Sequence, residues 1–96
     1  MVIEIAVITI VPGQEKDFEV AFEKARAYLA ASPGCLSYQL TRCIEHPTRY
    51  VLRNEWATLA DHTEVFRGSD AYQAYRDLVY PYYGAPPDVL HYHDVG

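Results

Sequence analysis

Apolar and polar positions alternate in a way that divides this chain into strand-like and helix-like stretches. Residues 2–11 carry apolar side chains on both faces, which indicates a central strand covered on both sides. Pro12-Gly13 ends this run, and apolar residues then recur at helical spacing. The stretch therefore predicts an amphipathic helix with an inner stripe made of Phe18, Phe22, Ala25 and Leu29.

Two further strands are expected at residues 35–43 and 49–56, with a short turn between them that makes them a hairpin. Neither strand has a fully polar face, unlike a sheet that is wet on one side. We therefore expect helices to cover one face of the sheet. Another element, such as a second copy of the chain, would cover the other face.

The second half of the chain predicts two helical pieces and a last strand. Thr58 and Asp61 form a capping-box-like start for a helix that ends near Phe66. Ser69 caps a second helix over residues 70–80, and residues 89–95 alternate as a strand. The order β-α-β-β-α-β predicts a ferredoxin-like α+β fold, with an antiparallel sheet and helices on one face, formed by a single domain over residues 1–96.

Charge and cysteine content narrow the class of protein. A net charge of −5 with only eight Lys and Arg leaves no basic patch, so we expect no nucleic-acid partner and no membrane partner. Cys35 and Cys43 fall near opposite ends of one predicted strand, too far apart for a disulfide. Free thiols are typical of a reducing compartment, and we expect a cytoplasmic protein.

Standard catalytic motifs are missing from the sequence: it has no glycine-rich phosphate loop, no CxxC, no HExxH and no nucleophile elbow. His91 and His93 stand two positions apart on the last predicted strand and could supply two metal ligands. No third ligand is identifiable, so we expect no metal site.

Aromatic residues give the strongest chemical signal, with nine tyrosines and a single tryptophan in 96 residues. An aromatic pocket with a few polar groups suits a planar phenol-like or quinone-like ligand. The candidate substrate-binding residues are Trp56, Tyr72 and Tyr75, and the candidate catalytic residues are Asn54 and His62. His62 could act as a base near neutral pH, or it could simply pack beside Trp56.

Several segments together resemble the antibiotic biosynthesis monooxygenase family, whose members are small dimeric α+β barrel proteins. These segments are Pro12-Gly13, PGCLSYQL, RYVLRNEW, the following His62, GSDAYQAY and the closing GAPPDVLHYHDV. The resemblance implies a homodimer in which two sheets pack face to face, with a ligand pocket between sheet and helices in each subunit. Trp56 matches the family's tryptophan, whereas Leu52 and His62 stand where a quinol-oxidising branch carries an asparagine and an aromatic hydroxyl.

The resemblance also implies an activity. Some members of the family oxidise quinols or anthrones with oxygen and without metal or flavin, so we expect a cofactor-independent monooxygenase of a small phenol, quinol or polyketide-like substrate. Two alternatives stay open. One is a non-catalytic dimer that binds an aromatic metabolite, and the other is an isomerase, cyclase or decarboxylase of the same fold.

Overall fold

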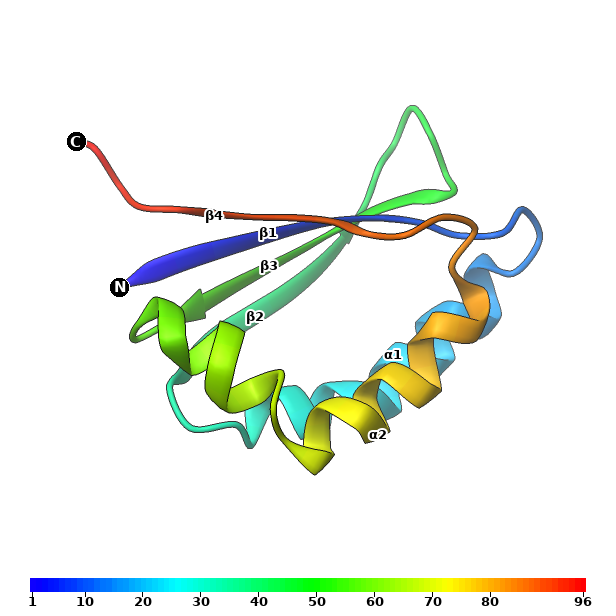
Figure 1. The fold of residues 1–96 in the computed structure, drawn as a ribbon. Helices are drawn as coiled ribbons and strands as arrows, with labels where there is room; N and C mark the ends of the chain where they lie inside the picture. Colours follow the sequence, from blue (N-terminus) through cyan, green and yellow to red (C-terminus); the bar gives the residue numbers. More distant parts are fainter.

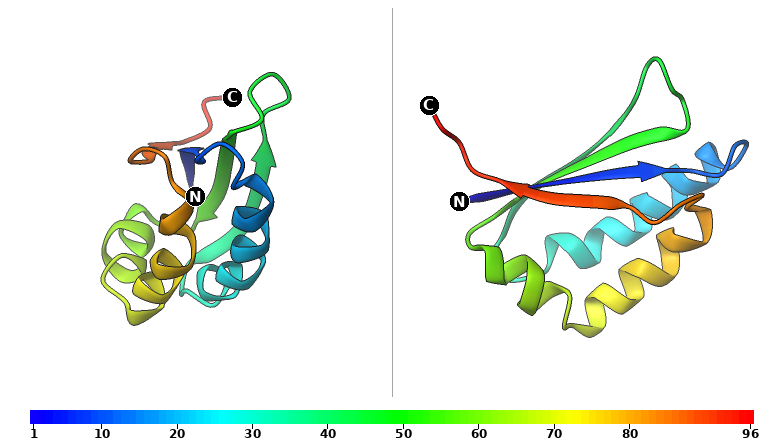
Figure 2. Two further views of the ribbon diagram at one scale, coloured as in Figure 1. Left: turned by 90° about the vertical axis from the view of Figure 1, so that its right-hand side faces the viewer. Right: turned by 45° about the horizontal axis from the view of Figure 1, so that its top comes forward.

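A computed structural model describes residues 1–96 and shows a four-stranded antiparallel sheet with helices on one face (Figures 1 and 2). The strands lie in the order β2-β3-β1-β4, which confirms the predicted ferredoxin-like α+β fold. The elements are β1 (Val2–Thr9), α1 (Glu15–Ala30), β2 (Cys35–Arg42), β3 (Arg49–Trp56), a π-helical turn η1 (Asp61–Phe66), α2 (Asp70–Val79), a 3₁₀ turn η2 (Tyr80–Tyr82) and β4 (Asp88–Tyr92).

The first strand lies in the middle of the sheet, as its apolar faces predict. β1 pairs with β3 on one side and with β4 on the other, and β2 and β3 form the expected hairpin. β1 ends at Thr9, two residues earlier than predicted. Ile10 makes only an isolated bridge to Tyr83, after which the chain turns through Gly13 at a φ of +90°.

The helices cover the inner face of the sheet and enclose the core. The predicted inner stripe of α1 is buried, and Ala21 joins it. β1 and β3 face this stripe with inward side chains that include Ala6, Ile8, Tyr50 and Leu52. Burial of these apolar side chains is the main stabilising contribution to a domain of this size.

The segment after β3 differs in detail from its prediction. The expected first helical piece is a π-helical turn, η1, which begins at Asp61. Its start has the predicted capping contacts, because Asp61 N donates to Thr58 Oγ1 and Thr58 N donates to Asp61 Oδ2. Ser69 caps α2 by accepting a hydrogen bond from Tyr72 N. π-Turns are rare and occur frequently at functional sites.

The outer face of the sheet has no helix over it and is rich in apolar side chains. Ile5 and Val7 of β1, Val51 of β3 and Leu90 of β4 lie on this face, and Leu90 is 54% exposed. An apolar face of this kind in a single chain needs a cover. None of the helices has the length and apolar character required to cross a membrane.

Candidate functional site

A buried carboxylate lies on the inner face of the sheet, where strand pairing brings β1 and β3 together. Glu4 is directly opposite Asn54 in the ladder and is only 5% exposed. Its Oε1 atom accepts hydrogen bonds from Asn54 Nδ2 at 2.9 Å and from Trp56 Nε1 at 3.0 Å. A buried carboxylate is costly unless it is paired in this way. Glu4 therefore accepts hydrogen bonds from both Asn54 and Trp56 at the end of β3.

His62 completes this cluster from the helical side. The π-turn η1 places its ring against Trp56, with ring centroids 5.0 Å apart and an interplanar angle of 21°. His62 Nε2 lies 3.3 Å from Glu4 Oε1. The carboxylate favours the tautomer with a proton on Nε2, which leaves Nδ1 as an acceptor.

Burial is the main influence on the charge of His62. It lowers the pKa of His62 well below its usual range, and electrostatic interactions with Arg67 and His91 act in the same direction. His62 is therefore a neutral imidazole near pH 7.

His91 extends the cluster toward the edge of the sheet. The Nδ1 atom of His62 lies 2.8 Å from Nε2 of His91, which comes from β4 and is half-buried. With Nδ1 as the acceptor, His91 donates this hydrogen bond. Glu4, His62 and His91 thus form a continuous polar chain from the inner face of the sheet to a partly exposed residue.

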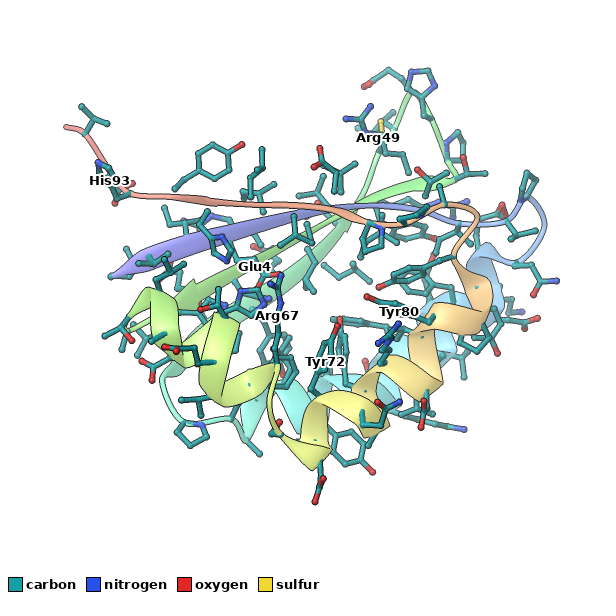
Figure 3. The ribbon with its side chains drawn as sticks, in the orientation of Figure 1. Glu4, Arg49, Arg67, Tyr72, Tyr80 and His93 are labelled. Atoms are coloured by element: carbon teal, nitrogen blue, oxygen red, sulfur yellow. The ribbon has the colours of Figure 1, made fainter.

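A cavity of about 60 Å³ opens beside this chain, between the sheet and the helices. Figure 3 shows Glu4 on the sheet side, with Arg67, Tyr72 and Tyr80 around the same space. Its walls are mostly apolar and aromatic, and the lining residues include Ala6, Ile8, Leu52, Asn54, His62, Phe66, Tyr75, Tyr83 and Val89. The cavity is much smaller than the roughly 300–1,000 Å³ of typical ligand pockets. Entry of an aromatic ring therefore requires side chains at its edge to move.

Tyr75, Tyr80 and Tyr83 are neutral hydrogen-bonding groups around the cavity. Burial raises the pKa of Tyr75 and of Tyr83, and burial together with the hydrogen bond to Tyr72 raises the pKa of Tyr80 to about 12. The hydroxyl oxygens of Tyr72 and Tyr80 lie 3.4 Å apart. These groups can orient a polar ligand without adding charge.

The sequence-predicted site residues are largely brought together. Asn54, His62, Tyr72 and Tyr75 all line the cavity. Trp56 does not line it: the indole is fully buried, where it donates to Glu4 and stacks on His62. Its place is behind the polar residues and not on the wall that a ligand would touch.

The histidine pair considered from the sequence is separated in the structure. His93 lies beyond the end of β4 and is exposed, whereas His91 turns inward to His62. No group of three metal-ligating side chains converges anywhere in the structure.

Glu4 and Arg67 are cavity residues that the sequence analysis missed. A signal for Glu4 was present, because it shares a strand face with Ala6, Ile8 and Ile10, which are all core residues. A lone acid on the buried face of a strand points to a paired or functional carboxylate. Arg67 gave no comparable signal, because an arginine after a helical turn is ordinary at the protein surface, and Arg67 is indeed exposed.

The fold and this site define a small ferredoxin-like α+β protein with an acid–imidazole cluster beside an aromatic cavity. The chain belongs to the antibiotic biosynthesis monooxygenase family, whose model matches residues 1–78. The uncharacterised protein YczJ of Bacillus subtilis is 41% identical over 95 residues, which span 99% of this chain and 100% of YczJ.

Solved structures extend the likeness to the complete fold. A Bordetella bronchiseptica protein named for the same monooxygenase family superposes with a TM-score of 0.94 at 39% identity, covering 98% of this chain and 96% of that one. A variant of SnoaB, a cofactor-independent oxygenase from Streptomyces nogalater, superposes with a TM-score of 0.82. It is 16% identical, with coverage of 97% and 91% of the two chains, and so shows the fold alone. Membership of the family supports a monooxygenase function for this chain.

Proposed function

We propose that this protein is a cofactor-independent monooxygenase of a small phenol, quinol or polyketide-like substrate, and that it acts as a homodimer. The observation that carries the proposal is the buried Glu4 carboxylate, which is held by Asn54, Trp56 and His62 and lines an aromatic cavity. SnoaB, which shares the fold, is described as an oxygenase that needs no cofactor.

The proposed chemistry begins with removal of a phenolic proton. Both hydrogen bonds to Glu4, and its close contact with His62, end on Oε1, so Oε2 is the oxygen available to a substrate hydroxyl. General-base assistance of this kind typically contributes about 10²–10⁴-fold to a rate. His62 joins Glu4 to His91. When the imidazole carries its proton on Nδ1 instead, Nε2 can accept from Glu4 and Nδ1 can donate to His91, which gives the proton a path toward solvent.

The phenolate anion is the species that reacts with oxygen in this scheme. It gives up an electron to O₂, and recombination forms a carbon–oxygen bond. The balance for a quinol is one quinol and one O₂ giving one hydroxyquinone and one water. The protein contributes proton removal, orientation and a cavity with mostly apolar walls.

A homodimer supplies the missing cover for the sheet. The outer face carries Ile5, Val7, Val51 and Leu90, and a second sheet packed on it would bury these residues. The resemblance to dimeric α+β barrels supports the same arrangement. Free Cys35 and Cys43 support our further proposal that the protein works in the reducing cytoplasm.

Oxygen uptake tests the proposal directly. Purified protein is mixed with a panel of quinols, anthrones and phenols in an oxygen electrode, and wild type is compared with His62→Gln and Trp56→Phe. The exposed turn residue His46 provides the matched control His46→Gln. We expect turnover of at least one substrate, a loss of about tenfold or more in His62→Gln and an unchanged rate in the control.

One observation favours a second candidate function. A carboxylate and two imidazoles in a chain are suited to moving protons, which an isomerase, cyclase or decarboxylase needs even without oxygen. Product analysis under anaerobic conditions separates the two reactions, because only the monooxygenase stops when oxygen is removed. Thermal stabilisation by a ligand without any turnover would instead identify a non-catalytic binding protein.

A further inference from the structure

One end of the cavity holds a buried acceptor that has no partner. Asn54 is 1% exposed and lines the cavity, and its Oδ1 makes no hydrogen bond. The orientation of this amide is fixed, because its Nδ2 donates to the Glu4 carboxylate, which can only accept. A buried unpaired carbonyl costs about 1–3 kcal/mol. The deep end of the cavity therefore favours a ligand that carries a hydrogen-bond donor.

The exposed edge of the cavity holds a cation that has no partner. Arg67 lines the cavity but is itself exposed, so it marks the mouth. Three other arginines form ion pairs, and Arg76 lies over the ring of Tyr80. The guanidinium of Arg67 takes part in no ion pair and no side-chain hydrogen bond. In Figure 3 it lies between the helical layer and Glu4.

We propose that the cavity selects a monocyclic aromatic acid that carries a ring hydroxyl, with the hydroxyl at Asn54 and Glu4 and the anionic group at Arg67. This inference rests on the proposed function, since it names the substrate class of the same site. It goes beyond that function by assigning Arg67 as the residue that distinguishes an acid from a neutral phenol.

The polarity of the site fits such a molecule at each position. A ring hydroxyl can donate to one of the acceptors at the deep end, Asn54 Oδ1 or Glu4 Oε2. A carboxylate at the mouth would meet Arg67, whose planar fork matches two carboxylate oxygens. Tyr72 and Tyr80 also line the cavity, and their hydroxyl pair can donate a hydrogen bond as well.

The size of the cavity favours one ring over several. A volume of about 60 Å³ holds little more than a few water molecules, so even a single ring requires the edge to open. Fused rings would require displacement of the core residues that form the walls, such as Ile8 and Leu52. Dense packing makes that displacement costly.

Calorimetric titration under nitrogen tests the assignment without turnover. Wild-type protein is titrated at pH 7.5 with 4-hydroxybenzoate, with 4-hydroxybenzamide, which has the same shape without the charge, and with benzoate, which lacks the hydroxyl. We expect 4-hydroxybenzoate to bind about tenfold or more tightly than either analogue, as charge-assisted and buried hydrogen bonds predict. In Arg67→Gln the preference over the amide should disappear, while binding of the amide changes by less than about twofold.

The control is Arg26→Gln, which removes an exposed charge on α1 and should leave all three affinities unchanged. Equal binding of acid and amide by wild type would overturn the role of Arg67, and equal binding of benzoate would overturn the deep hydroxyl site. Binding of none of the three overturns the substrate class. The same titration is independent of oxygen chemistry. Tight binding of 4-hydroxybenzoate without oxygen uptake contradicts the proposed function and leaves this inference standing. Turnover of neutral quinols by a wild type that binds acid and amide equally contradicts only this inference.

Discussion

Replacing Glu4 tests whether one buried carboxylate holds the end of β3 and the imidazole in place. Glu4→Ala removes the acceptor and leaves Asn54 Nδ2 and Trp56 Nε1 as buried donors without partners. Glu4→Gln removes the charge but keeps an amide oxygen that can accept both hydrogen bonds. The two variants therefore separate the loss of the acceptor from the loss of the charge.

The expected magnitudes follow from the number of donors. Each buried donor without a partner costs about 1–3 kcal/mol, so Glu4→Ala should lower the free energy of unfolding by about 2–6 kcal/mol. At about 0.05–0.15 kcal/mol per residue, a chain of 96 residues has a total of about 5–14 kcal/mol. Glu4→Gln should cost less than about 2 kcal/mol, because weaker hydrogen bonds are offset by the removal of a buried charge.

Urea denaturation at one fixed protein concentration measures these differences, since a dimer would make stability depend on concentration. Glu23→Ala is the matched control, because this exposed glutamate pairs only with Arg26 and should change stability by less than about 0.5 kcal/mol. A loss below about 1 kcal/mol in Glu4→Ala would refute the reasoning. So would a Glu4→Gln variant as unstable as Glu4→Ala.

Three other outcomes are expected. Burial holds the folded-state pKa of His62 below its unfolded value of about 6.5, so its contribution to the free energy of unfolding is present above pH 6.5 and is lost as pH falls, by up to about 1.4 kcal/mol per pH unit. His62→Gln should flatten this part of the stability profile measured in urea, and an unchanged slope would contradict the neutral imidazole. His91→Ala should lower kcat about tenfold or more, whereas exposed His93→Ala should not, and equal rates in both would exclude the proposed proton path. Ser69→Ala should destabilise α2 by about 1 kcal/mol in thermal unfolding, and no shift in Tm would contradict its cap.

The strand and helix pattern could be predicted because local signals agreed with tertiary packing. The stripe on α1, the hairpin of β2 and β3 and the Ser69 cap all follow from spacing within a few residues. Element ends were less accurate, since pairing partners far away in the sequence decide them. β4, for example, ends at Tyr92, the residue that pairs with Ile3 of β1, although the alternating sequence pattern predicts a strand up to Val95.

Only part of the site could be predicted, because its contacts also join residues that lie far apart in the sequence. Asn54 and His62 stood out as polar residues near an aromatic cluster, but their connection to Glu4 spans about 50 residues and depends on the register of β1 against β3. A one-residue shift in that register would turn Glu4 to the outer face. His91 was considered together with His93, and only the placement of β4 beside β1 shows that it belongs with His62.

Isotope labelling with ¹⁸O₂ tests the central claim most directly. Wild-type protein, Glu4→Gln and the control Glu23→Gln are incubated with a substrate that supports oxygen uptake, in the presence of a metal chelator, and the product is analysed by mass spectrometry. The proposal predicts one ¹⁸O atom in each product molecule for wild type and the control, formed at the same rate. It also predicts a rate at least about 100-fold lower in Glu4→Gln. Product formed without ¹⁸O, or formed equally fast by Glu4→Gln, would contradict a monooxygenase that depends on this buried carboxylate.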